Sequence, residues 1–191
     1  MSEAVAKKPR KHQKNDASMG KLTLTLGAIC AVCALVLGGV YTLTAEQIKK
    51  NQLGDKANAM QLVLMADDYS EVTYAGSDAS ILSVYQAGDA GYVVEVDCAS
   101  NSFSGVLSIM VGVNADGTVS GVEVLDSTET SGLGAIAKED ANWRAQFVGK
   151  SGEIKVDKDG GEIASISGAT ITSRGVSTGV TSALAAVAEL S

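Results

Sequence analysis

The chain has 191 residues, a length that suits one compact domain plus an anchor. Residues 1–21 hold six basic and two acidic side chains, a net charge of +4, so the remainder must carry −11 to give the total of −7. A body this acidic would repel phosphates, which argues against nucleic acid as the main partner. The sole histidine is His12, and only Cys98 of the three cysteines lies in the body, which excludes a usual zinc site, a Ser-His-Asp triad and an internal disulfide there.

An uncharged apolar run extends from Leu22 to Ala45. About 20 apolar residues suffice to cross a bilayer core as a helix, so a transmembrane helix is expected over residues 22–44. A cleaved signal peptide is the competing interpretation, but the run exceeds the usual ~7–15 residues and no clear cleavage motif follows it. Basic residues cluster before the run, so the positive-inside bias predicts a single-pass protein of the cytoplasmic membrane, with residues 1–21 as a basic cytoplasmic tail and the body outside.

Two cysteines and several small residues lie within this apolar run. Cys30 and Cys33 are three positions apart and share one helix face. An iron–sulfur cluster normally takes four cysteines, so this pair would supply only half of its ligands, and burial against neighbouring helices is the favoured interpretation. Gly38 and Gly39 suit close helix packing, which predicts a partner subunit in the membrane.

The body begins with helical sequence and then changes to strand patterns. Residues 45–66 contain good helix formers and no proline, and they predict a linker helix that spaces the body from the membrane. Residues 81–86 and 92–98 predict a hairpin, and residues 105–113 and 118–125 predict another. Alternation predicts one buried face on these strands, formed by Tyr92, Val94, Val96, Cys98, Leu107, Ile109, Val111 and Val113. Cys98 is therefore interpreted as a small apolar core residue without a redox role.

The C-terminal part is predicted to form helices and one short strand. Residues 136–149 predict a helix that places Trp143 and Phe147 in the core, and residues 153–157 predict a strand. The last helix is expected to begin near Ser173 and to bury one apolar stripe. Because strands and helices mix without a regular βαβ alternation, the sequence predicts an α+β domain over residues 67–191.

A cluster of small hydroxyl residues precedes the last helix. Residues 167–173 read Ser-Gly-Ala-Thr-Ile-Thr-Ser. Any one hydroxyl here is an ordinary helix N-cap. Gly168 and Ala169 also remove side-chain bulk where a helix N-terminus presents amides suited to phosphate. The residues alone therefore indicate a tight turn that tolerates phosphate.

Two motifs resemble those of the FMN-binding domain family, which includes the G subunit of the Rnf electron transport complex and the C subunit of the sodium-pumping NADH:quinone oxidoreductase. The first is Ser167-Gly168-Ala169-Thr170 followed by Thr172 and Ser173, and the second is Glu129-Thr130-Ser131-Gly132-Leu133-Gly134. The resemblance implies FMN held as a phosphoester on Thr170, installed by a flavin transferase. It further implies a flavin site formed by Ser167, Gly168, Ala169, Thr172, Ser173, Glu129, Thr130, Gly132, Leu133 and Gly134, with no metal and no catalytic side chain.

The chain departs from the family pattern at two positions. Ser131 stands where the family usually has proline, and Ala164 stands where it often has an aspartate that assists the transferase. Glu162, two residues earlier, is a candidate substitute for that aspartate.

The resemblance implies an electron carrier within a larger assembly. The leading hypothesis is a subunit of an Rnf-type complex, which couples ferredoxin:NAD⁺ oxidoreduction to movement of Na⁺ or H⁺ and contains further membrane and iron–sulfur subunits. One alternative is a C-subunit-like component of the sodium-translocating NADH:quinone oxidoreductase. Others are a stand-alone extracytoplasmic flavoprotein and a binding domain that has lost its flavin.

Overall fold

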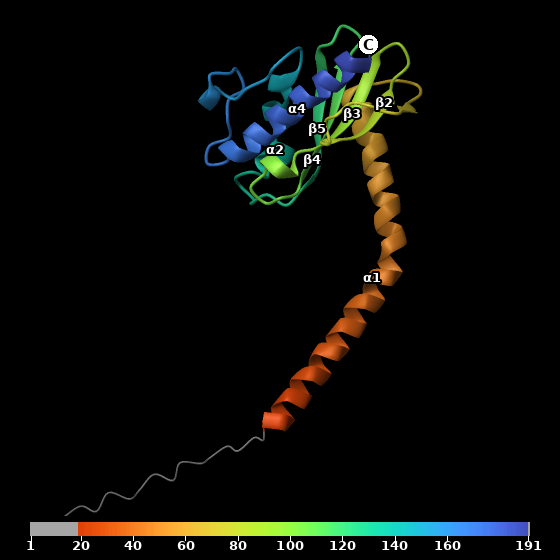
Figure 1. The fold of residues 1–191 in the computed structure, drawn as a ribbon, viewed down its shortest axis with the longest axis vertical. Coiled ribbons are helices and arrows are strands. Elements are labelled where there is room, and N and C mark those ends of the chain that lie inside the picture. The colour runs from red at the N-terminus through yellow and green to blue at the C-terminus, as the bar shows by residue number, and fades with distance from the viewer. Residues whose placement is uncertain (1–18, 191) are drawn as a thin grey trace, which may run out of the picture. The chain divides into compact units, whose positions relative to one another are not determined.

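The computed structural model describes residues 19–190 (Figure 1). Most of the predicted basic tail, including His12, lies outside this range. The described residues divide into two units, one that ends at Lys50 and one that begins at Asn51. The predicted membrane helix and most of the predicted linker helix form one continuous helix, α1 (Met19–Val63).

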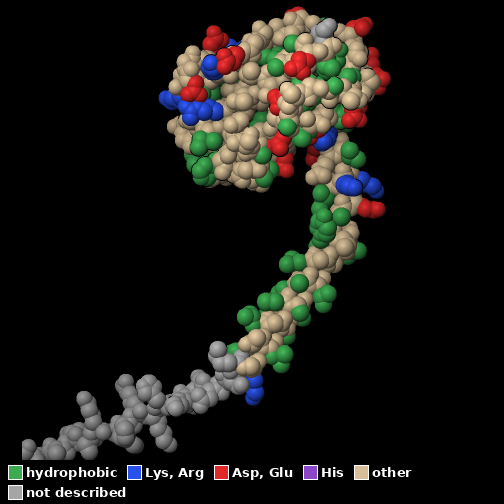
Figure 2. Space-filling view, in the orientation of Figure 1, with side chains coloured by type: hydrophobic (Ala, Val, Ile, Leu, Met, Phe, Trp, Pro, Cys, Tyr) green, Lys and Arg blue, Asp and Glu red, His purple; other side chains and the backbone are tan. Residues whose placement is uncertain are grey.

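The first unit is the apolar part of α1. An 18-residue window of α1 has a mean hydropathy of 2.2, and none of that window is buried. Leu24, Leu35 and Leu43 are 76%, 77% and 85% exposed, and hydrophobic side chains follow one another along this part of the helix (Figure 2). Leucines in such numbers are stable in a lipid environment and unfavourable in water. This helix is therefore long and apolar enough to cross a membrane.

The second unit contains an antiparallel sheet in which each strand pairs with the next (Figure 1). Its strands are β1 (Ser70–Val72), β2 (Ile81–Gln86), β3 (Gly91–Asp97), β4 (Leu107–Asn114) and β5 (Val119–Ser127). Both predicted hairpins are confirmed, β2 with β3 and β4 with β5. The short β1 was not predicted from the sequence. Together with the helices that follow, the sheet confirms the α+β fold class.

The long C-terminal helix α4 (Thr170–Leu190) covers one face of the sheet. Its apolar stripe packs with the inward side chains of the strands into one core that includes Val94, Ile109, Val176 and Val180. The buried face that alternation predicted is therefore confirmed, except that Tyr92 at its edge is only partly buried. Glycines on α4 allow the close approach, since a Cβ on Gly179 would collide with the Cys98 sulfur.

The expectation that only one face is buried was wrong. Val93, on the other face of β3, is fully buried, and it packs with Met110 and with Ala59 and Met60 at the end of α1. A Cβ on Gly112 would collide with the Val63 carbonyl, so the absence of a side chain at this position in the sheet makes room for the helix end. The last turns of α1 thus belong to the core of the domain, in addition to any spacing role.

An ion pair between a half-buried lysine and a buried glutamate joins the same two elements. Glu95 on β3 is only 4% exposed, and its Oε2 accepts hydrogen bonds from Lys56 Nζ (2.8 Å) and Ser83 Oγ (2.7 Å). A buried carboxylate is unfavourable unless it is paired and hydrogen-bonded. The alternation of the strand predicts that Glu95 faces water. In the structure its carboxylate is buried, and Lys56 compensates its charge.

Two predicted elements differ in the structure. Residues 136–149 form two short helices and a 3₁₀ turn, α2 (Ile136–Glu139), α3 (Ala141–Arg144) and η2 (Ala145–Phe147), because Asp140 adopts an extended backbone and its carboxylate accepts the Asn142 N–H as a helix cap. The strand expected over residues 153–157 is absent from the described residues. An isolated bridge between Val156 and Ile163 and the 3₁₀ turn η3 (Asp157–Asp159) replace it.

Cys98 is expected to resist thiol reagents in the native protein. Its side chain is 2% exposed, and burial raises the pKa of the thiol to about 12, so almost no thiolate exists at pH 8. Alkylation with iodoacetamide followed by peptide mass spectrometry should leave Cys98 unmodified, whereas alkylation in denaturant should modify it fully. Modification of Cys98 in the folded protein at a rate near that of a free cysteine would contradict the core assignment.

Candidate functional site

The turn before α4 is fixed by a buried serine. Ser173 is fully buried; its Oγ donates to the Ala169 carbonyl (3.0 Å) and accepts from the Ile166 N–H (3.0 Å). Gly168 has a φ of +77°, in the left-handed region that favours glycine. These features place Thr170 at the first position of α4, three residues earlier than the sequence analysis expected.

Thr170 presents its hydroxyl at this helix start. The residue is half-buried, and among residues 19–190 no hydrogen-bond partner of its hydroxyl is found. The first turn of a helix leaves backbone N–H groups without intrahelical partners and carries the positive end of the helix dipole. The position therefore combines an available hydroxyl with a local environment that favours an attached or bound phosphate.

The loop of residues 129–134 lies against this turn. The Leu133 N–H donates to the Thr130 carbonyl (3.1 Å), and Gly132 has a φ of +75°. Gly134 is buried: a Cβ there would lie 2.6 Å from Glu129 Oε2 and 2.8 Å from Thr172 Oγ1. A Cβ on Gly168 would lie 2.9 Å from Leu133 Cδ2. The two motifs therefore pack closely at Gly134, which has no room for a side chain, and at Gly168, where the positive φ favours glycine.

Arg144 holds the segment after this loop against the sheet. It is 9% exposed, and its Nη1 donates to the Ala137 carbonyl on α2 (3.1 Å) while its Nη2 pairs with Glu123 on β5 (2.9 Å). Trp143 and Phe147 pack edge to face with ring centroids 5.5 Å apart. Both rings are buried, which confirms their assignment to the core.

A cavity of about 300 Å³ opens where the two motifs meet. The motif residues that line it are Glu129, Thr130, Leu133, Gly134, Gly168, Ala169, Thr170 and Thr172. Three predicted residues do not line the cavity: Ser167, Gly132 and Ser173. Gly132, with its positive φ, and Ser173, which is buried, instead fix the shape of the two loops. Lining residues of the two motifs, at least 34 positions apart in the sequence (Gly134 to Gly168), thus converge on one hydroxyl.

Two further lining residues, Phe103 and Ile171, were missed by sequence reasoning. Phe103 is 72% exposed, Ile171 48% and Leu133 42%. Exposed apolar side chains around a cavity are typical of ligand sites. An aromatic residue within the polar segment Asn-Ser-Phe-Ser-Gly (residues 101–105) was the available signal, because nothing in such a loop would need it for packing.

Three charged residues near the turn, Glu162, Asp157 and Arg174, do not line the cavity. Glu162, the candidate substitute for the family aspartate, is largely exposed and pairs with Lys150 (2.5 Å). Asp157 contacts the segment just before the motif: its Oδ1 accepts the Ser165 N–H (3.1 Å), and hydrogen bonds from Ser165 lower the pKa of the Asp157 carboxyl. Arg174 on α4 makes two 2.6 Å bonds to Asp159.

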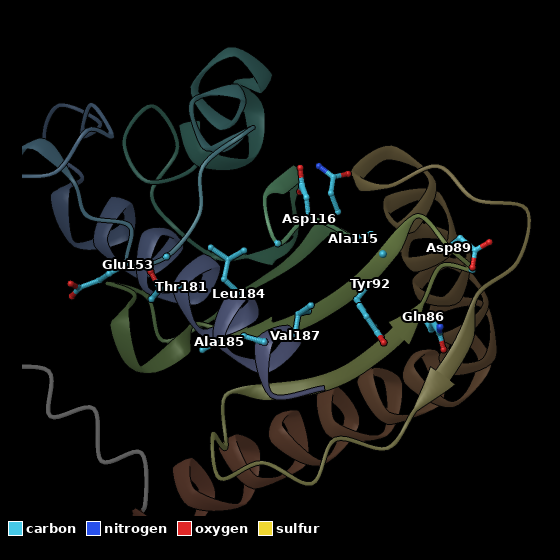
Figure 3. A pocket seen from close by; sticks show the side chains of 16 residues that line it. Gln86, Asp89, Tyr92, Ala115, Asp116, Glu153, Thr181, Leu184, Ala185 and Val187 are labelled. Carbon is cyan, nitrogen blue, oxygen red and sulfur yellow. The ribbon is translucent and has the colours of Figure 1, made fainter. Parts of the chain in front are cut away.

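A larger cavity of about 810 Å³ lies at the other end of α4 (Figure 3). Tyr92, Leu184 and Val187 line it together with the turns at Asp89 and Asp116. None of the motif residues contributes to it. Its size alone gives no chemistry, so the smaller cavity at Thr170 is the candidate functional site.

Two models of protein families match the chain. The model of the FMN-binding domain matches residues 103–185, and the model of the RnfG N-terminal region matches residues 11–63. The matched domain spans every residue that lines the cavity. The chain therefore contains an FMN-binding domain.

Curated relatives cover most of the chain. The G subunit of the ion-translocating oxidoreductase complex of Methanosarcina acetivorans is 32% identical over 167 residues, which is 82% of this chain and 87% of that protein. The G subunit of the Na⁺-translocating ferredoxin:NAD⁺ oxidoreductase complex of Acetobacterium woodii is 32% identical over 182 residues, 84% and 87% of the two chains. Its proton-translocating counterpart in Clostridium ljungdahlii is 28% identical over 181 residues, 90% and 92%. The chain thus belongs to the family of G subunits of Rnf-type ion-translocating oxidoreductase complexes, as an FMN-binding, electron-carrying membrane subunit.

Proposed function

We propose that Thr170 carries FMN through a phosphoester and that the cavity around it holds the flavin. The observation that carries this proposal is the convergence of both motifs on a hydroxyl that has no partner among the described residues. FMN fits the site, because the start of α4 suits a phosphate and the exposed apolar rim of Phe103, Leu133 and Ile171 suits an aromatic ring.

The chain's own residues position and shield the group. When bound, FMN supplies one- and two-electron transfer. Gly168 and Gly134 allow the two loops to approach each other, and the apolar rim removes water from the face of the ring that it contacts. Covalent attachment prevents loss of the cofactor from a shallow cavity. No side chain is required to act as a general acid or base.

We further propose a place for this subunit in its complex. Relatives are named as subunits of Na⁺-translocating and proton-translocating ferredoxin:NAD⁺ oxidoreductases. By this likeness, the chain relays electrons within such a complex and thereby contributes to ion translocation. The basic tail and apolar helix support an N-terminus in the cytoplasm and a flavin domain outside it. A flavin transferase on that side then attaches FMN to the folded domain.

Membranes of a host that lacks the subunit provide the test. They should lose ferredoxin-dependent NAD⁺ reduction, and the wild-type chain should restore both this activity and the co-purification of the other subunits. An externally added protease should cleave the domain only from the extracytoplasmic side. Full activity in membranes without the subunit, or cleavage from the cytoplasmic side, would refute this placement.

Ala164→Asp is expected to accelerate flavinylation. Ala164 is exposed, and its N–H and carbonyl are held by Gln146 and Trp143, so a carboxylate there would remain solvated while the turn is kept in place. Restoring the family's acidic residue should raise the initial rate of FMN attachment by a transferase about threefold to tenfold, the usual scale of one surface charge effect of about 1 kcal/mol. In-gel flavin fluorescence against time measures the rate.

Ala164→Asn is the matched control, since it has nearly the same shape and no charge. It should leave the rate close to that of the wild type. Equal rates for all three proteins would mean that another group, such as Asp157 at Ser165, already supplies the acidic function.

A further inference from the structure

Glu129 lines the flavin cavity, but its carboxylate is engaged elsewhere. Glu129 Oε1 accepts hydrogen bonds from the Phe103 N–H (2.9 Å), the Ser104 N–H (3.2 Å) and the Ser104 Oγ (3.3 Å). Hydrogen bonds to an ionised group are roughly twice as strong as neutral ones. One carboxylate oxygen therefore holds the segment that contains Phe103, 26 residues earlier in the chain.

The held segment has little else to fix it. Residues 102–106 connect the 3₁₀ turn η1 (Ala99–Asn101) to β4, and none of their side chains is buried. Phe103 itself is 72% exposed. The other hydrogen bonds of the segment are short-range, such as the Gly105 N–H to Ser102 Oγ (2.9 Å), except at its end, where the Val106 carbonyl accepts the Thr128 N–H (3.3 Å). The hydrophobic core therefore does not anchor this loop, and at Phe103 and Ser104 the long-range hydrogen bonds come from Glu129.

We propose that Glu129 is a positioning residue, which fixes the Phe103 loop so that the aromatic ring forms a wall of the flavin cavity over Thr170. This inference rests on the proposed attachment of FMN to Thr170. In it, Glu129 acts through Phe103, by accepting backbone hydrogen bonds, and its charge does not act on the flavin. A residue that sequence resemblance alone would count as a flavin contact thereby receives a different role.

The proposal separates two substitutions at the same position. Glu129→Gln retains an oxygen that accepts the two N–H groups, whereas Glu129→Ala removes the acceptor. Loss of hydrogen bonds to a charged group is worth about 1.5–3 kcal/mol, so the alanine variant should speed amide exchange of Phe103 and Ser104 about tenfold to a hundredfold. Glu129→Gln keeps the acceptor but loses the charge, so its amide exchange should rise by about threefold to tenfold, less than in the alanine variant. Glu139→Ala, which removes an exposed glutamate on α2, is the matched control.

The second measurement is the exposure of the bound flavin in full-length protein carrying FMN. Quenching of flavin fluorescence by iodide should increase about twofold or more in Phe103→Ala and equally in Glu129→Ala, because both remove the wall that shields the ring. The double variant should be no more quenched than either single variant, since the two substitutions act through one contact. The flavin midpoint potential of Glu129→Gln should match that of the wild type.

Each other outcome overturns the proposal. Unchanged amide exchange in Glu129→Ala would show that the carboxylate does not hold the loop. Faster exchange with unchanged iodide quenching would show that the loop does not shield the flavin. A shifted potential in Glu129→Gln with the loop still protected would identify a direct charge effect. Absence of FMN on wild-type Thr170, seen first by mass spectrometry, would instead refute the proposed function.

Discussion

Thr170→Ala is expected to abolish covalent FMN completely. The hydroxyl oxygen is the atom that would bond to phosphorus, and alanine has no atom that can replace it. Two other threonines line the cavity. Thr172 is 1% exposed and so is not accessible to a transferase. Thr130 is exposed, but it lies in a loop and not at a helix start that favours phosphate. Protein co-expressed with a flavin transferase should therefore show an FMN adduct by intact mass and in-gel fluorescence in the wild type and none in the variant.

The matched control is Thr178→Ala, an exposed threonine two turns further along α4. It changes the same side chain on the same helix and should leave the adduct at the wild-type level. Thr170→Ala should keep its folding and its co-purification with the complex, because the Thr170 hydroxyl holds no other described element in place. An adduct that persists in Thr170→Ala would move the attachment site elsewhere.

The elements that sequence reasoning found are those encoded by short-range patterns. The two hairpins follow from alternation around glycine-rich turns, and Gly88 and Gly117 indeed have φ values of +52° and +79°. The apolar stripe of α4 predicted its buried face. Cys98 followed from its place in the alternation of β3. In each case neighbours in the sequence are neighbours in space, so a local pattern is sufficient.

The missed features depend on contacts between distant segments. The end of α1 covers the second sheet face, and Lys56 neutralises Glu95 from 39 residues away. Glu129 holds the Phe103 loop at the flavin cavity from 26 residues away. Ser173 resembled an ordinary cap, yet it accepts a hydrogen bond from Ile166, seven residues earlier. No periodicity in a single sequence specifies such pairings, because they depend on how the elements pack.

For the motif residues, the sequence predicted some features of the site and missed others. The resemblance brought together two loops whose sequences are unrelated, and the cavity at Thr170 contains eight of the predicted residues. It could not distinguish residues that line the cavity from those that shape its walls. Gly132 and Gly134 differ in this respect: Gly132 has a positive φ and open space around it, whereas Gly134 has no positive φ and crowded surroundings.

This difference predicts that a substitution at Gly134 is poorly tolerated, whereas one at Gly132 is well tolerated. In Gly134→Val the Cβ would meet Glu129 Oε2 at 2.6 Å, Glu129 Cβ at 2.8 Å and Thr172 Oγ1 at 2.8 Å, so either the Glu129 segment or the first turn of α4 must move. Overpacking of this kind costs about 1–3 kcal/mol. Both elements that would move line the cavity. We expect the variant to fold, to lose several degrees in Tm, and to acquire FMN at least about tenfold more slowly.

Gly132→Asn is the control for this prediction. Asparagine tolerates the left-handed conformation better than most residues, and nothing lies within 4 Å of a Cβ at this position, so stability should fall by less than about 1 kcal/mol and flavinylation should persist. Thermal unfolding and the rate of FMN attachment, measured on the same preparations, test both variants. If Gly134→Val attaches FMN as fast as Gly132→Asn does, the close contact between the two loops is not required for the flavin site.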